Sequence, residues 1–210
     1  MAIAKLAHIH LASCEESANR LRQLGEQNFR IYNVGAPQLD NIIGQNYTSK
    51  EITIDHQKIN LMIPYILLVQ HPILVEHGNT RTQIRSPLDA CISMKMPIIW
   101  IYPNSDLGFQ EIVSEIESLQ DSKDITALKN LKREDYLRLL ANAAVLVGNS
   151  SSGILEAPSF KVPVVNIGNR QRGRQQASNI VNCENNSLEI ARTIDHCLNN
   201  PEFKEACILA

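Results

Sequence analysis

Residues 143–174 read AAVLVGNSSSGILEAPSFKVPVVNIGNRQRGR, and they contain the most informative pattern in the chain. The apolar run Val145 to Val147 predicts a strand, which ends in the polar turn Gly148 to Gly153 and leads into a short helix. At a helix start, several backbone N–H groups lack partners and carry the positive end of the helix dipole. Glycines allow close approach to the backbone, and serine hydroxyls add neutral donors. This strand–turn–helix therefore suits a phosphate group.

A carboxylate and several arginines accompany this turn. Glu156 follows about one helical turn later, where it can accept hydrogen bonds from sugar hydroxyls. A second apolar strand, Val162 to Ile167, leads into the cationic turn Asn169 to Arg174, in which Arg170 lies closest to the strand end. Phosphate cradle, carboxylate and arginines together suggest a nucleotide-sugar site. The alternative is a serine helix cap beside solvated surface arginines.

Composition narrows the class of protein. The 210 residues are 44% hydrophobic and 20% charged, as in ordinary soluble domains, and the net charge of −2 gives no electrostatic reason to expect nucleic acid or an anionic membrane as partner. No apolar run approaches the roughly 18 residues that a membrane-spanning helix needs. Five cysteines, an odd number without CxxC spacing, favour reduced thiols over disulfides or a zinc site. We therefore expect a cytoplasmic protein without a metal.

Apolar runs typical of strands alternate with amphipathic stretches typical of helices. The predicted strands are 7–11, 31–34, 65–69, 98–102, 125–131, 145–147, 162–167 and, as an edge strand, 180–183; the predicted helices lie near 15–24, 80–95, 109–119, 133–141 and 186–200. This alternation predicts an α/β fold, a Rossmann-like parallel sheet with helices on both faces. The chain has neither a GxGxxG turn after its first strand nor a P-loop lysine motif, which argues against NAD or ATP.

Polar residues gather where the predicted strands end. They are Asp40, His71, Asn104, Asp106, the serine turn and Arg170. Ligands of open α/β sheets bind beyond the carboxyl ends of the strands, so these residues predict a single site. His71 can contact a diphosphate or donate a proton, and it is the candidate catalytic residue; its alternative is a loop histidine bonded to the backbone. Asp40, Asn104 and Asp106 have the alternative of capping helices.

The segments GNSSSGILEAPSF and VPVVNIGNRQRGR together resemble the hallmark of the UDP-N-acetylglucosamine 2-epimerase family. The similarity is to its hydrolysing branch, which makes N-acetylmannosamine for sialic-acid-type sugars. IAKLAHIH at the start, VGAPQLDNI, QHP and YPNSD agree with the same family, so the resemblance covers essentially the whole chain. Related glycosyltransferases share a Gly/Ser turn and a downstream glutamate, but not usually this arginine turn.

The resemblance implies two Rossmann-like domains in the glycosyltransferase-B arrangement, with UDP-N-acetylglucosamine in the cleft between them and no cofactor. The implied substrate-binding residues are Ser150 and Ser151 for the diphosphate, Glu156 for the ribose hydroxyls, Arg170 and His71 near the phosphates, and Asn104 and Asp40 along the cleft. One position departs from the pattern, because Gln110 stands where some members carry a cation.

The chemistry of this family resembles an elimination followed by hydration. A base removes the proton at C2, UDP leaves, and water adds to the glycal. The acid/base carboxylates belong to the first domain, which would end near residue 30 here. We therefore expect residues 1–30 to be the last βα unit of an otherwise missing domain and residues 31–210 to be the UDP-binding domain.

Such a chain would have little or no turnover alone. Its expected partners are UDP or UDP-N-acetylglucosamine, together with a complementing first domain or a second copy, and neither nucleic acid nor a membrane. Two alternatives remain open from the sequence. One is a glycosyltransferase that uses a UDP-sugar donor, and the other is a non-catalytic UDP-sugar-binding remnant.

Overall fold

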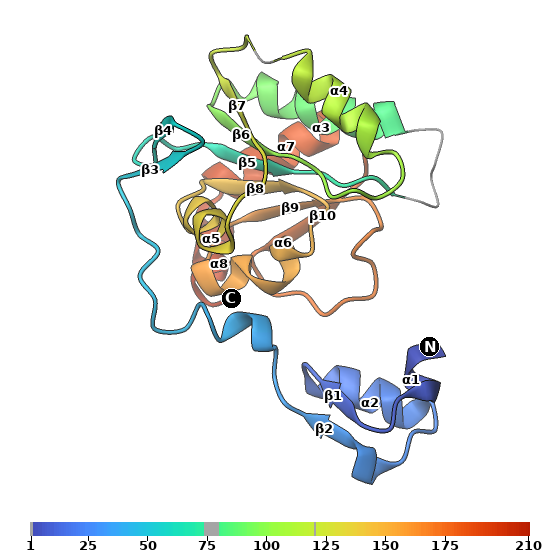
Figure 1. The fold of residues 1–210 in the computed structure, drawn as a ribbon. Helices are drawn as coiled ribbons and strands as arrows, with labels where there is room; N and C mark the ends of the chain where they lie inside the picture. Colours follow the sequence, from blue (N-terminus) through green and yellow to red (C-terminus); the bar gives the residue numbers. More distant parts are fainter. Residues whose placement is uncertain (1, 74–79, 120) are drawn as a thin grey trace. The chain divides into compact units, whose positions relative to one another are not determined.

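The structure, a computed structural model, describes residues 2–73, 80–119 and 121–210. The chain divides into two compact units, Met1–Asn46 and Tyr47–Ala210 (Figure 1). The domain boundary predicted near residue 30 concerns a larger architecture and stays a prediction. Among the described helices, none is both long enough and apolar enough to cross a membrane.

The first unit is built around a pair of parallel strands. Its elements are α1 (Ala2–Leu6), β1 (His10–Ala12), α2 (Glu15–Gln23), η1 (Asn28–Arg30), β2 (Ile31–Asn33) and η2 (Pro37–Leu39). One face of the strand pair, with Ala12 and Ile31, packs against Ala18 of α2. The strand predicted at residues 7–11 is shorter and starts later, at His10–Ala12, and the residues Ala2–Leu6 before it form the single-turn helix α1.

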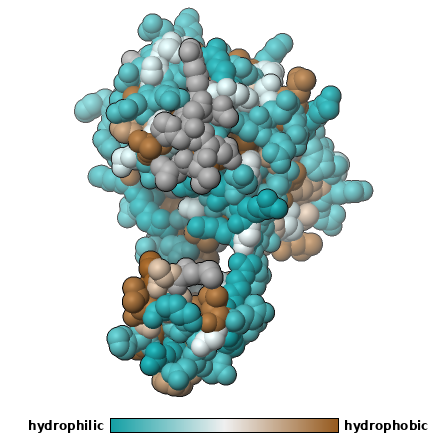
Figure 2. All heavy atoms as spheres, turned by 90° about the vertical axis from the view of Figure 1, so that its right-hand side faces the viewer, coloured by the Kyte–Doolittle hydropathy of each residue, from teal (hydrophilic) through white to brown (hydrophobic). Residues whose placement is uncertain are grey.

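The other face of this strand pair exposes apolar side chains. Ile9 and Leu11 are 61% and 68% exposed, and Tyr32 and Val34 are 52% and 50% exposed. Side chains alternate between the two faces of a strand, so these four belong to the face opposite α2. Figure 2 shows apolar surface gathered on this small unit. Parallel strands are ordinarily covered on both faces, but the described residues of this unit leave one apolar face uncovered.

The second unit contains a six-stranded parallel sheet in the order β10-β9-β8-β5-β6-β7. Its strands are β5 (Ile66–Val69), β6 (Ile98–Ile101), β7 (Ile125–Leu128), β8 (Val145–Gly148), β9 (Val164–Ile167) and β10 (Ile180–Cys183). Numbered along the chain, these strands follow the Rossmann order 3-2-1-4-5-6, which confirms the predicted fold class. The strand order reverses between β5 and β8. The predicted edge strand, β10, does lie at an edge.

Helices cover both faces of this sheet, as predicted (Figure 1). One layer holds α3 (Thr80–Ser93), α4 (Phe109–Glu117) and α7 (Ser187–Asn199), and the other holds α5 (Arg133–Ala141) and η4 (Ala157–Phe160). Strand β5 shows how one strand serves both cores. Ile66 and Leu68 pack into the first layer, whereas Leu67 and Val69 pack into the second. A continuous apolar run is what a strand buried on both faces requires.

A β-hairpin and the last helix of the second unit were not predicted. The hairpin of β3 (Glu51–Ile54) and β4 (Gln57–Asn60) turns at Asp55 and His56, both with positive φ, and buries two isoleucines against the second layer. Helix α8 (Pro201–Ile208) follows directly after α7. Asn200 caps it by accepting a hydrogen bond from the Phe203 N–H at 2.8 Å, with proline in the first turn. Pro201 therefore begins a new helix where it ends the previous one.

Candidate functional site

The site lies where β5 and β8 run side by side and the strand order reverses. Val69 pairs with Gly148 at the carboxyl ends of these strands, so the segments that follow them leave the sheet next to each other. Gly148 has a φ of +135°, and a Cβ there would lie only 2.1 Å from the Val69 carbonyl oxygen. Only glycine fits this backbone and this contact. The close approach brings His71 and the serine turn together.

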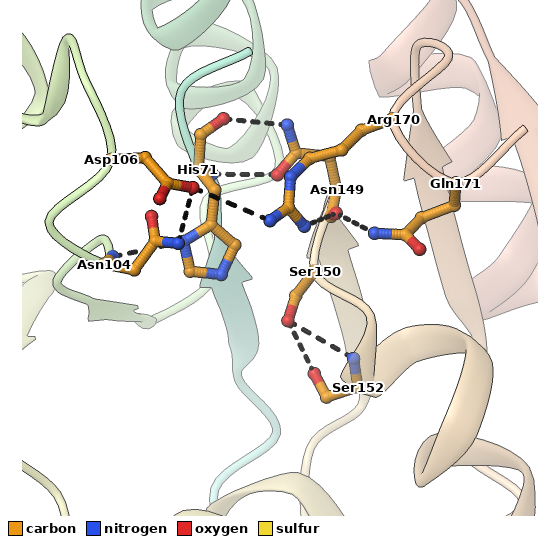
Figure 3. Close-up of polar contacts among 8 residues, drawn as sticks. All are labelled: His71, Asn104, Asp106, Asn149, Ser150, Ser152, Arg170 and Gln171. Atoms are coloured by element: carbon orange, nitrogen blue, oxygen red, sulfur yellow. Dashed lines mark hydrogen bonds and ion pairs between the residues drawn. The ribbon is translucent and has the colours of Figure 1, made fainter. Parts of the chain in front are cut away.

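Asn149 joins three strand ends through its side chain and its main chain (Figure 3). Its Oδ1 accepts from the His71 N–H at 2.8 Å, and its Nδ2 donates to the His71 carbonyl at 2.8 Å. Its own carbonyl accepts from Gln171 Nε2 at 2.8 Å and from Arg170 Nη1 at 3.2 Å. Asn149 is fully buried, and Gln171 is 2% exposed. The segments after β5, β8 and β9 are thereby fixed to one another.

His71 lies among polar groups from two further loops (Figure 3). The Asn104 backbone N–H donates to His71 Nδ1 at 3.3 Å, and Asn104 Nδ2 donates to Asp106 Oδ2 at 2.6 Å. Arg170 Nη2 lies 4.0 Å from the same Asp106 oxygen. Burial and the nearby Arg170 cation lower the pKa of His71 to about 4, while the Asp106 carboxylate acts in the opposite direction. His71 is therefore a neutral imidazole at pH 7.

The serine turn offers both hydroxyls and backbone amides. Ser150 Oγ accepts from the Ser152 N–H at 3.3 Å and from Ser152 Oγ at 2.9 Å, and the Tyr136 hydroxyl also bonds to Ser152. Within residues 2–73, 80–119 and 121–210, the backbone N–H groups of Ser150 and Ser151 have no hydrogen-bond partner. The helix that follows, α6 (Ser152–Leu155), is a single turn, so its dipole is small and the two amides matter more.

Glu156 and a cavity extend the site away from the serine turn. Glu156 is buried, and its Oε1 accepts from Arg133 Nη1 at 3.1 Å. Arg133 and Tyr136 also line a cavity of about 620 Å³ at the carboxyl ends of β6 and β7. Tyr102, Phe109 and Leu131 give this cavity a largely apolar wall. Because Tyr136 contacts both the cavity and Ser152, the cavity and the serine turn are neighbours.

The structure brings most of the predicted site residues together. Hydrogen bonds and an ion pair connect His71, Asn104, Asp106 and Arg170 with the strand end that carries Ser150. Ser151 belongs to the same turn, and Glu156 follows α6. Asp40, at the end of η2, belongs to the first unit, and its role stays a prediction. In the described part of the chain, no group of three or more His, Cys, Asp or Glu side chains is arranged to hold a metal ion.

Four residues that sequence reasoning passed over belong to this arrangement. They are Arg133, Tyr136, Asn149 and Gln171. Asn149 lies between the end of β8 and the serine turn, and this position could have indicated a role in the site. No sequence signal indicated Gln171, because a glutamine inside a cationic turn is expected to be exposed to solvent.

A Rossmann-like sheet with a polar site at its switch point defines the class of the second unit. The family model for UDP-N-acetylglucosamine 2-epimerase matches residues 1–207, so the chain belongs to this family. The resemblance drawn from the turn motifs is thus confirmed.

Two curated relatives have similar sequences. One is the UDP-N,N'-diacetylbacillosamine 2-epimerase (hydrolyzing) of Legionella pneumophila, which is 34% identical over 97% of this chain and 54% of the relative. The other is the UDP-N-acetylglucosamine 2-epimerase of Neisseria meningitidis, which is 32% identical over 96% of this chain and 53% of the relative. The chain therefore spans about half the length of the curated relatives it matches.

Solved structures show the same fold at lower sequence identity. S. aureus MnaA in complex with UDP aligns with a TM-score of 0.74 at 17% identity, covering 98% of this chain and 54% of that one. The N. meningitidis UDP-GlcNAc 2-epimerase bound to UDP-GlcNAc aligns with a TM-score of 0.71 at 14% identity, covering 97% of this chain and 57% of that one.

Proposed function

We propose that this chain supplies the UDP-binding half of a hydrolysing UDP-N-acetylglucosamine 2-epimerase, which converts UDP-N-acetylglucosamine into N-acetylmannosamine and UDP. The observation that carries the proposal is the convergence of Ser150, His71 and Arg170 at the switch point of a sheet in a member of this family. The chain's five cysteines are free thiols, which suits a cytoplasmic location.

The neighbouring groups match the parts of UDP in order. The free amides of Ser150 and Ser151, with His71 and Arg170, are suited to the diphosphate. The Glu156 carboxylate is suited to the ribose hydroxyls. The cavity beyond Arg133, with its largely apolar wall, has the volume and character for a planar base. Asn104 and Asp40 are proposed as further substrate-binding residues.

These groups would assist the departure of UDP. As the bond between sugar and diphosphate breaks, negative charge grows on the diphosphate, and fixed donors stabilise it. One such donor contributes roughly 2.7–4 kcal/mol of barrier in other enzymes. That effect cannot replace a base at C2, which we assign to carboxylates of a first domain. We therefore expect weak or no turnover by this chain without a complementing domain or a second copy.

We further propose that residues 1–30 complete such a first domain and that residues 31–210 form the UDP-binding domain. The exposed side chains of Ile9 and Leu11 support a first domain, because a parallel strand such as β1 requires further covering structure. Its partner strand β2 (Ile31–Asn33) lies just past the proposed boundary. A helix layer from the first domain would supply that cover.

The binding role of Glu156 can be measured by calorimetry with UDP and with 2′-deoxy-UDP. We expect UDP to bind the wild type, and Glu156→Ala to weaken that binding roughly tenfold to a hundredfold, since a hydrogen bond to a charged group is lost. The deoxy analogue should bind the wild type more weakly than UDP, whereas Glu156→Ala should no longer distinguish the two.

Glu134→Ala is the matched control, because Glu134 is an exposed carboxylate in the first turn of α5. It should bind UDP like the wild type. A folded wild-type protein that releases no heat with UDP would contradict the proposed function. Equal heats for the wild type and Glu156→Ala would contradict the role of Glu156 alone.

Turnover can be tested by mixing the chain with the separately produced first half of a hydrolysing relative. With UDP-N-acetylglucosamine and no acceptor, we expect release of UDP and N-acetylmannosamine from the mixture and little from either part. UDP-N,N'-diacetylbacillosamine serves as a second substrate, since one relative carries that name. Turnover only when a sugar acceptor is added would instead identify a glycosyltransferase.

A further inference from the structure

The groups around His71 determine which nitrogen of its imidazole carries the proton. Asn149 holds both backbone groups of His71 at 2.8 Å, so the residue has little freedom to move. On the side chain, the Asn104 backbone N–H points at Nδ1 from 3.3 Å. A backbone N–H can only donate, so Nδ1 must carry the lone pair and the ring proton must sit on Nε2.

Among the residues that the structure describes, the charged groups that act on the imidazole are Arg170 and Asp106. Arg170 is fixed by its hydrogen bond to the Asn149 carbonyl and opposes protonation of the ring. Asp106 favours protonation, but it is exposed and shared with Asn104 Nδ2 and the guanidinium. Burial of the ring also disfavours its charged form, in agreement with the lowered pKa described above.

We propose that His71 binds the diphosphate as a neutral hydrogen-bond donor through Nε2–H, and does not act as the proton donor to the leaving UDP. The inference rests on the proposed function and decides between the two roles that the sequence left open for this histidine. The chemistry permits it, because a terminal phosphate group has a pKa near 6 and departs at pH 7 without being protonated. Stabilising its charge is sufficient.

The first test reads the imidazole directly in the ligand-free full chain. Nitrogen-15 NMR of the ring, assigned by comparison with His71→Gln, should show the neutral Nε2–H tautomer across pH 5.5–8. An unperturbed histidine would titrate near pH 6.5. A titration midpoint inside that range, or a proton on Nδ1, would overturn the proposal.

The second test uses UDP binding and two substitutions of matched size. His71→Gln can place an amide N–H near the position of Nε2, whereas His71→Leu has no donor. We expect His71→Gln to keep UDP affinity within about threefold of the wild type and His71→Leu to lose roughly tenfold or more. The ratio of wild-type to His71→Gln affinity should stay constant between pH 5.5 and 8, since neither donor titrates there.

The remaining outcomes are also decisive. Equal losses in His71→Gln and His71→Leu would show that a neutral donor at this position contributes nothing to UDP binding, and an affinity ratio that rises as the pH falls would show that the charged imidazole is required. Either result would overturn the proposal. His196→Leu, in α7, controls for loss of a histidine elsewhere and should bind UDP normally. If the folded wild type binds no UDP, the proposed function fails together with the diphosphate contact, whereas the NMR titration still decides the tautomer.

Discussion

Gly148→Ala is expected to destabilise the protein by about 3–5 kcal/mol, from overpacking and backbone strain together. The added Cβ would sit 2.1 Å from the Val69 carbonyl oxygen and 2.7 Å from its carbonyl carbon. Both are backbone atoms of a central strand, so neither can rotate away, and β5 and β8 would have to separate. The φ of +135° adds strain for any residue with a side chain.

Thermal unfolding measures this effect, with an expected fall in melting temperature of roughly 10 °C. Gly168→Ala is the matched control at the end of β9. It also has a positive φ, +69°, but no atom lies within 4 Å of its Cβ position. It should cost only about 1–2 kcal/mol, the strain of a left-handed residue. Equal losses for the two variants would show that the contact with Val69 does not matter.

Asn149→Leu is expected to remove both stability and UDP binding. Leucine has a similar size but leaves the N–H and the carbonyl of His71 without partners, which costs about 2–4 kcal/mol. His71 and the segment after β8 would then lose their fixed relation. We expect UDP affinity to fall at least tenfold, because both side-chain hydrogen bonds of Asn149 hold His71 in the proposed site.

Asn179→Leu separates the two effects. Asn179 is also fully buried, and its Nδ2 donates to the Val162 carbonyl at 2.7 Å, at the amino end of β10. Its replacement should lower the melting temperature and leave UDP affinity unchanged. Calorimetry at a temperature where all variants are folded makes the comparison. If both variants weaken UDP binding equally, Asn149 has no specific role in the site.

Much of the fold could be predicted from the sequence, because a strand buried on both faces appears in the sequence as a continuous apolar run. The run at residues 65–69 is typical of a strand buried on both faces, and the run at residues 98–102 was predicted as the next strand; the structure confirms both strands. The order of the strands could not be predicted, since the alternation of strands with helices indicates a parallel sheet but not which strands pair. The β3–β4 hairpin was missed because four-residue strands are too short for their alternation to stand out.

The sequence predicted which residues gather at the candidate site, but not the hydrogen bonds that join them. Strand ends converge in a parallel sheet, so His71, Asn104 and Arg170 could be grouped without coordinates. Which polar side chain binds protein and which is left for a ligand depends on distances across the sheet. Asn149 and Gln171 are buried partners of the backbone, yet in sequence they look like any other polar turn residues.

The pairing of β5 with β8 has a consequence for when the proposed UDP site forms during folding. His71 and Asn149 are 78 positions apart, and the two strands meet only after β6 and β7, with their helices, have been synthesised. Contacts of such long range form slowly during folding. A ribosome-bound chain or a partly collapsed intermediate would therefore contain the serine turn and the histidine without the site. Retention on immobilised UDP would report completed folding of the sheet, and would separate mature molecules from nearly folded ones.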